Sequence, residues 1–232
     1  MTREATPPIP ELNDALLERL PLFPLPNAVL FPGAILPLHF FEPRYRALAE
    51  FCVRGPRVMA IGAIQPGFEV DYDGRPPVLP VLSVGAIHAE RRHADGRWDI
   101  SLRGLTRVEL LSEHPAGEPF RLIRARRLRE HERRDDTMLA ERLRSGVIQL
   151  LNLIPSLWPQ MDPQLVAART PSALADIVAA NFIDDPSARR ILLEQLEVGR
   201  RLDIVQGVVA QLILEATLRA HQARGGKPDF LH

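Results

Sequence analysis

The spacing of apolar residues divides the chain into two parts with different periodicities. From Leu20 to about Arg129, apolar runs are short and are interrupted by proline and glycine, which is typical of strands and turns. In the second part, apolar residues recur every three or four positions, which predicts amphipathic helices. Because strands and helices are segregated, we expect an α+β fold. The predicted domains are a loose tail over 1–19, a β-rich domain over 20–130 and a helical domain over 131–232.

The stretch LPLFPLPNAVLFPGAILPLHFFEPRYRALAE, residues 20–50, is apolar almost to its end and rich in proline. Proline lacks a backbone donor and therefore favours sheet edges and bends. We expect short strand pieces at 20–25, 28–30 and 35–38. Glu42-Pro43 is typical of a helix start and predicts a helix that continues to Arg54.

A hairpin is the clearest signal in the β-rich part. Asp95-Gly96 favours a tight turn, because both residue types tolerate positive φ. On the return strand, Trp98, Ile100 and Leu102 alternate with polar residues, which predicts one buried face. Further strands are expected over 58–64 and 120–128.

Four helices are expected in the second part. The first covers about 137–154 and is ended by Pro155, the second is capped by Ser172, and the third begins at Asp185-Pro186. The last and longest runs from about Gly199 to Gln222. It carries an apolar seam with alternating steps of three and four residues, which comprises Leu202, Val205, Val209, Leu212 and Ala216. Two heptads of this kind indicate packing within a helical bundle, or alternatively a homodimer contact.

Composition excludes several classes of function. The formal net charge is zero, which gives no overall electrostatic attraction for nucleic acids or anionic membranes. Lys227 is the only lysine and is followed by Pro228, so no P-loop is present. Cys52 is the only cysteine, which excludes an intramolecular disulfide and a multi-cysteine zinc site. We expect no signal peptide and no membrane span, and therefore a cytoplasmic protein.

Three separated motifs together resemble the N-terminal domain of Lon proteases. They are LPLFPLPNAVLFPGAILPL (20–38), VGAIHAERRHADGRWDISLRGLTRVELL (84–111) and LADIVAANFIDDPSARRILLEQLEVGRRLDIVQGVVAQLI (174–213), in the family's order. FEPRYR (41–46) is closer to small stand-alone proteins of this kind. The resemblance implies a PUA-like β pseudobarrel followed by a helical bundle, and a role in recruiting protein substrates. The ATPase and Ser–Lys peptidase modules have no counterpart here, so we expect no enzymatic activity.

Two surfaces are candidate binding sites. If a groove lies between sheet and helices, its wall includes His39, Phe41, Glu42, Arg44 and Tyr45, although structural roles are the preferred interpretation for the residues at the helix start. The second surface is an arginine face in FRLIRARRLRE, which consists of Arg121, Arg124, Arg126, Arg127 and Arg129. It is interpreted first as a solvated strand face with acidic partners, and alternatively as an RNA or phosphate site.

No cofactor and no metal site are predicted. His88 and His93 are the closest histidines in the sequence, but their offset does not bring them together on a strand. Asp71 and Asp73 resemble the start of a calcium loop whose distal glutamate is missing. The leading hypothesis is therefore a non-enzymatic module that binds unfolded polypeptide or a specific protein partner, including Lon protease itself, as an adaptor for proteolysis. RNA or phosphate-ligand binding is the alternative.

Overall fold

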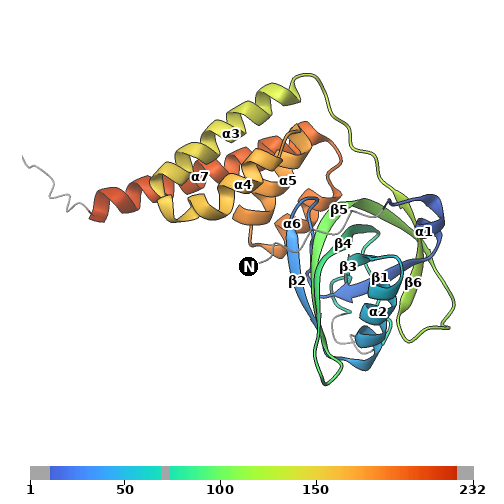
Figure 1. Cartoon of the computed structure of the whole chain (residues 1–232). Helices are drawn as coiled ribbons and strands as arrows, with labels where there is room; N and C mark the ends of the chain where they lie inside the picture. The colour runs from blue at the N-terminus through green and yellow to red at the C-terminus, as the bar shows by residue number, and fades with distance from the viewer. Residues whose placement is uncertain (1–10, 69–73, 224–232) are drawn as a thin grey trace, which may run out of the picture. The chain divides into compact units, whose positions relative to one another are not determined.

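The computed structural model describes residues 11–68 and 74–223 (Figure 1). The chain forms two compact units. The first unit contains the residues up to 129 together with 184–196, and the second contains 130–183 and the residues from 197 onward. The division of the chain into separate domains stays a prediction, and the two units are described one at a time below.

A six-stranded mixed sheet forms the first unit. Its strands are β1 (Leu20–Leu25), β2 (Ile35–Phe40), β3 (Val58–Ala63), β4 (Val81–Arg92), β5 (Trp98–Glu113) and β6 (Arg121–Arg127). The order is β2-β5-β4-β3-β1-β6, and an additional pairing between β5 and β6 closes the sheet into a ring. Only β1 and β3 are parallel to each other. With helices following the ring in sequence, the predicted α+β class and pseudobarrel are confirmed (Figure 1).

Ring closure depends on the length of β5, because two strands share one of its edges. The first half of β5 pairs with β2, and the second half pairs with β6. Gly104 lies between these halves, where its N–H donates to Ala34 and its carbonyl accepts from Gly33, both at 2.9 Å. These bonds hold the loop before β2 against the middle of β5.

Alternating residues of the strands build apolar clusters on the two faces of the sheet. On β3, Met59 and Ile61 belong to one cluster, and Val58 and Ala60 belong to the other. Helix α2 (Pro43–Arg54) packs into the first cluster through residues that include the fully buried Cys52. Helix α1 (Asp14–Glu18) contributes to the second cluster. Burial raises the pKa of the Cys52 thiol, so this side chain stays neutral and packs as a small apolar residue.

Helix α6 (Pro186–Glu194) belongs to the sheet unit despite its late position in the chain. The guanidinium of the buried Arg107 on β5 donates from Nε to the carbonyl of Leu193 at 2.8 Å. Arg189 donates to the carbonyl of Val29 at 3.3 Å. A buried arginine on the sheet therefore donates a hydrogen bond to a backbone carbonyl in the last turn of α6, which has no partner within the helix.

The second unit is a bundle of helices. Its elements are α3 (Asp136–Leu153), the short 3-10 helix η2 (Pro155–Leu157), α4 (Trp158–Ala167), α5 (Pro171–Phe182) and α7 (Val198–Ala223). Helices α3 and α7 lie side by side along most of α3 (Figure 1). A buried network links α7 to the rest of the unit. Arg201 donates to Glu130 at 2.7 Å and to Ser172 at 2.6 Å, and its Nε lies 3.7 Å from Asp176.

Most expected elements are found, with two corrections. Residues 28–30 form no strand, although Val29 and Leu30 are buried there, because the turn at 26–27 leads into a loop against β5. Thr170 rather than Ser172 caps α5, since its hydroxyl accepts from the N–H of Ala173 at 3.1 Å. Helix α4 was not expected, because its prolines obscure the helical pattern.

Candidate functional site

Among the described strands, β2 lies at an edge of the sheet. It pairs with β5 on one side, and no described strand pairs with its other side. The N–H of Gly104 bonds to the carbonyl of Ala34, and Ile35 is the register partner of Arg103. In an antiparallel ladder this arrangement makes Ile35 and Arg103 a pair that exchanges no backbone hydrogen bonds with each other.

The type of pair alternates along the strand, which fixes the direction of each backbone group. Every second residue from Leu36 bonds to β5, whereas Ile35, Pro37 and His39 direct their backbone groups to the free edge. This edge therefore offers three carbonyl acceptors and the N–H donors of Ile35 and His39. Pro37 has no donor to lose there, which explains how a proline fits within the strand.

The side chains of the same three residues are exposed on one face of the sheet. Next to them, a shallow hollow of about 360 Å³ extends across β2, β5 and β4. Two cross-strand rows line it, Pro37–Ser101–Ala89 and His39–Asp99–Arg91. A free backbone edge and an adjoining hollow thus occur together on the sheet unit.

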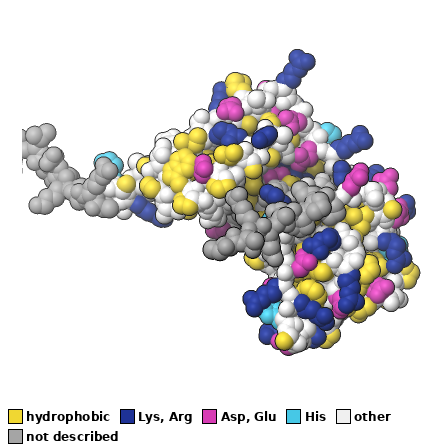
Figure 2. Space-filling view, viewed as in Figure 1, with side chains coloured by type: hydrophobic (Ala, Val, Ile, Leu, Met, Phe, Trp, Pro, Cys, Tyr) yellow, Lys and Arg dark blue, Asp and Glu magenta, His cyan; other side chains and the backbone are white. Residues whose placement is uncertain are grey.

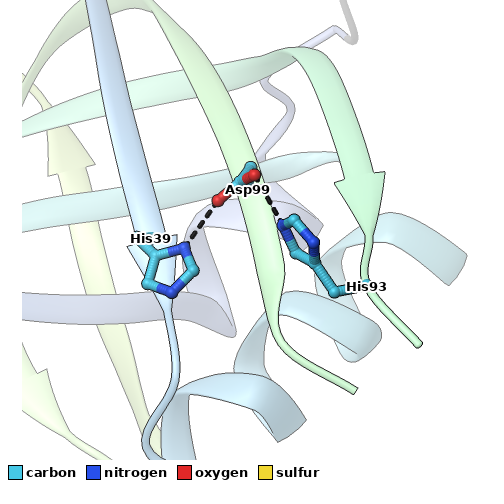
Figure 3. Close-up of side chains that lie close together, drawn as sticks. All are labelled: His39, His93 and Asp99. Atoms are coloured by element: carbon cyan, nitrogen blue, oxygen red, sulfur yellow. Dashed lines mark hydrogen bonds and ion pairs between the residues drawn. The ribbon is translucent and has the colours of Figure 1, made fainter. Parts of the chain in front are cut away.

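Asp99 connects two histidines at one end of this hollow (Figure 3). The Nδ1 of His39 lies 2.6 Å from one carboxylate oxygen, and the Nε2 of His93 lies 2.6 Å from the other. The hydrogen bonds from His39 and His93 hold the pKa of the Asp99 carboxyl below its ordinary value. His39 and Asp99 are direct partners in the β2–β5 register, and His93 follows β4 at the hairpin turn.

The five residues of the predicted groove lie in different environments. Tyr45 is buried in the core, with the Arg44 guanidinium 4.5 Å from the centre of its ring. Glu42 and Arg44 form an ion pair of 2.9 Å at the start of α2. Only His39 and Phe41 present much of their side chains to solvent, and their rings stack with centroids 6.1 Å apart.

The arginine face is largely neutralised by neighbouring groups. Arg121 is buried and bonds to Glu113 and to the carbonyl of Pro76. The outward-facing members have partners as well: Arg124 pairs with Glu18 at 2.9 Å, Arg126 pairs with Glu109 at 2.5 Å, and Arg127 donates to the carbonyl of Leu12 at 3.3 Å. Arg129 is exposed. These acids and carbonyls favour the interpretation of a paired strand face over an anion site.

The helical unit exposes apolar side chains, which are visible over its helices in Figure 2. They include Ile148 on α3, Val166 on α4, and Leu214 and Leu218 on α7. Of the predicted seam on α7, the first three positions are buried, whereas Leu212 and Ala216 are partly exposed. A homodimer through this helix stays a prediction. No helix in the described part of the chain has the length and apolar character that a membrane span requires.

Sequence reasoning singled out His39 and His93 without recognising Asp99 as the group that joins them. The sequence gives little indication of the contact between His39 and Asp99, because these residues become neighbours only through the register of two strands that are far apart in the chain. Asp71 and Asp73, whose likeness to a calcium loop was set aside in the sequence, lie outside the described residues.

Comparison with known proteins shows the family to which the chain is related. Residues 19–211 match the model of the ATP-dependent protease La (LON) substrate-binding domain. Lon protease 2 of Sorangium cellulosum is 28% identical over 211 residues, which cover 89% of this chain and 26% of that protein. Lon protease of Phenylobacterium zucineum is 28% identical over 206 residues, which cover 85% of this chain and 26% of that protein. The chain thus spans about a quarter of the length of these relatives.

Solved structures show the same fold. The N terminal domain of Mycobacterium avium complex Lon protease has a TM-score of 0.66 at 18% identity, and the match covers 83% of this chain and 98% of that one. A Lon N-terminal domain protein from Xanthomonas campestris has a TM-score of 0.55 at 21% identity, with 82% and 97% covered.

Proposed function

We propose that this chain, which belongs to the family of ATP-dependent protease La (LON) substrate-binding domains, binds extended polypeptide along the free edge of β2. The observation that carries the proposal is the set of backbone groups that Ile35, Pro37 and His39 direct away from β5. The role is one of binding without catalysis, in keeping with the part of the Lon proteases that the chain matches.

Strand addition suits a ligand without a fixed sequence. An incoming segment bonds to the edge through its own backbone, and every polypeptide carries that backbone. A partner strand along the six residues of β2 would be roughly 20 Å long at the usual rise of about 3.3 Å per residue. Alternate side chains of that partner would lie beside Ile35 and Pro37, close to the hollow.

Pro37 sets the strength of this pairing. It removes the central donor of the edge, and proline on an edge strand discourages uncontrolled addition of strands. We therefore expect binding that is weak and reversible, which is the behaviour required of a protein that must release its substrates. The outward apolar side chain of Ile35, 49% exposed, supplies a contact that is independent of the ladder.

The test is fluorescence anisotropy with fluorescein-labelled casein, a polypeptide without a stable fold. Wild-type protein should raise the anisotropy in a saturable way. Ile35→Lys places a charge on the edge and should weaken binding at least about tenfold, or about 1.4 kcal/mol. Leu111→Lys is the matched control, because Leu111 is 47% exposed on β5, away from the β2 edge. The control should bind like the wild type.

Equal binding by the two lysine variants would place the contact elsewhere, and no binding by the wild type would remove the function. A casein-derived peptide resynthesised with N-methyl groups at alternate residues separates backbone pairing from side-chain contact. It should lose binding if the ladder forms. In a parallel titration with fluorescein-labelled poly(U), binding that falls steeply with salt would instead favour the arginine face.

A finer hypothesis is that the bound polypeptide is passed to a Lon-type protease in the cytoplasm, so that the chain acts as an adaptor. It is motivated by the shared domain, whose family description is substrate binding. Purified Lon protease from the same organism should degrade labelled casein faster when this protein is added, and the Ile35→Lys variant should give no such increase. An unchanged rate with the wild-type protein would refute the adaptor role and leave polypeptide binding intact.

A further inference from the structure

Three side chains with metal-binding atoms meet at the end of the β4–β5 hairpin (Figure 3). They are His39 on β2, His93 at the turn and Asp99 on β5, and one ligand atom from each lies within 4.8 Å of the others. We propose that they form a binding site for a divalent transition-metal ion, with Zn²⁺ as the ion that fits them best.

The donor set is the basis for this choice of ion. Two imidazole nitrogens and one carboxylate oxygen are ligands that zinc accepts, whereas magnesium and calcium prefer sites made of oxygen alone. Three protein ligands leave a fourth tetrahedral position for water or for a group from outside. Since His39 also borders the hollow, that position would be accessible from solvent.

The present distances need only a small adjustment. Each histidine nitrogen lies 2.6 Å from its Asp99 oxygen. Atoms bound to one zinc ion at about 2.0–2.1 Å lie about 3.3 Å apart in a tetrahedron. The ion would replace both hydrogen bonds once each nitrogen moves less than about 1 Å away from its Asp99 oxygen. The ligand atoms, which now lie within 4.8 Å of one another, would close to this tetrahedral spacing. The side chains are 44% exposed for His39, 26% for His93 and 47% for Asp99, so the cluster lies at the surface of the sheet unit.

The backbone beneath the three side chains is held firmly, so binding would require little ordering. His39 and Asp99 are a pair of the β2–β5 ladder that exchanges no backbone hydrogen bonds, the type with the shorter Cα separation. The hairpin turn is closed by the N–H of His93, which donates to the carbonyl of Arg97 at 2.8 Å. Arg46 on α2 secures this turn by donating from Nε to the carbonyl of Gly96 at 2.9 Å.

Charged side chains near the site affect its affinity for zinc. Arg91 is the cross-strand neighbour of Asp99 on β4 and opposes a cation. Arg97 pairs with Asp95 at 2.7 Å, and the guanidinium of Arg92 lies 5.6 Å from the centre of the Trp98 ring. Protons compete with zinc for the imidazole nitrogens, so zinc binding should weaken in acid.

The experiment is isothermal titration of the metal-free wild-type protein with ZnCl₂ at pH 7.5 and again at pH 5.5. We expect one equivalent to bind at pH 7.5, with an affinity at least about tenfold lower at pH 5.5. His93→Ala and Asp99→Asn should each lower the affinity at pH 7.5 by at least about tenfold. His88→Ala removes a histidine of β4 outside the cluster and should keep the affinity within about twofold.

A second measurement guards against misfolded variants. Zinc should raise the unfolding temperature of the wild type and of His88→Ala but not that of His93→Ala, and without zinc the wild type and His93→Ala should unfold at similar temperatures. Zinc binding by His93→Ala as tight as that by the wild type would overturn the proposal. So would a wild-type affinity weaker than about 1 mM. The titration contains no polypeptide, so its failure is distinct from failure of the proposed function.

Discussion

Gly104 lies so close to the backbone of Phe31 that a Cβ at this position would be 2.1 Å from the Phe31 carbonyl oxygen. Backbone cannot rotate aside as a flexible side chain can, so Gly104→Ala must displace the loop from β5. We expect the free energy of unfolding to fall by about 3 kcal/mol in urea denaturation. Gly117→Ala is the control, because a Cβ there meets nothing within 4 Å, and it should change stability by less than about 0.5 kcal/mol.

The buried guanidinium of Arg201 should be required for the stability of the helical unit. Arg201 and Asp176 are each 1% exposed, so Arg201→Met removes a buried guanidinium that lies beside the buried Asp176 carboxylate. Removing one partner of such a pair costs about 3–5 kcal/mol, measurable by thermal or urea unfolding. Arg219→Met, at a side chain that is 81% exposed, should have almost no effect. If both variants lose a similar free energy of unfolding, burial of the arginine does not determine the effect of removing it.

The ion pair of Glu113 with Arg121 should make the sheet unit sensitive to acid. Burial raises the pKa of Glu113, but the hydrogen bonds and charges of Arg121 and Arg75 outweigh it and hold this pKa below its ordinary value. A lowered folded-state pKa means that the pair stabilises the protein above the unfolded pKa of about 4.3, and that this contribution is lost as the pH falls through the folded value.

Glu113→Gln should therefore destabilise the protein by about 1–3 kcal/mol at pH 7, and the difference from the wild type should shrink towards pH 3. Urea unfolding of the wild type and of Glu113→Gln at pH 7, 5 and 3 measures this difference in the free energy of unfolding. Glu118→Gln, at an exposed position in the neighbouring loop, should follow the wild type throughout. A loss for Glu113→Gln that does not depend on pH would contradict the ionic explanation.

Local patterns in the sequence predicted much of the fold because they reflect local physics. The alternation of Trp98, Ile100 and Leu102 correctly marks the buried face of β5, and Gly96 adopts a positive φ of 84° at the predicted turn. The buried arginines were not predictable in the same way. Arg107 is 1% exposed because the end of α6 accepts its hydrogen bond, and that helix follows much later in the chain.

The candidate site depended on register, which hydrophobic patterns do not specify between distant strands. His39 was identified as a residue of interest, but its contact with Asp99 requires both the β2–β5 pairing and its alignment. The edge position of β2 could likewise not be predicted, because it depends on the order of the strands in the sheet. The residues of FEPRYR, in contrast, were assigned mainly structural roles, and Glu42 and Arg44 pair with each other at the start of α2.

The late position of α6 in the chain has a consequence for how the protein matures on the ribosome. The sheet unit is discontinuous, because residues 184–196 complete it after the intervening residues 130–183. Domains usually fold as units from the N-terminus while synthesis continues. Here the hydrogen bond from Arg107 to the Leu193 carbonyl can form only after α6 has emerged from the exit tunnel. We therefore expect the time taken to translate 130–183 to set how long the sheet unit stays without its last helix.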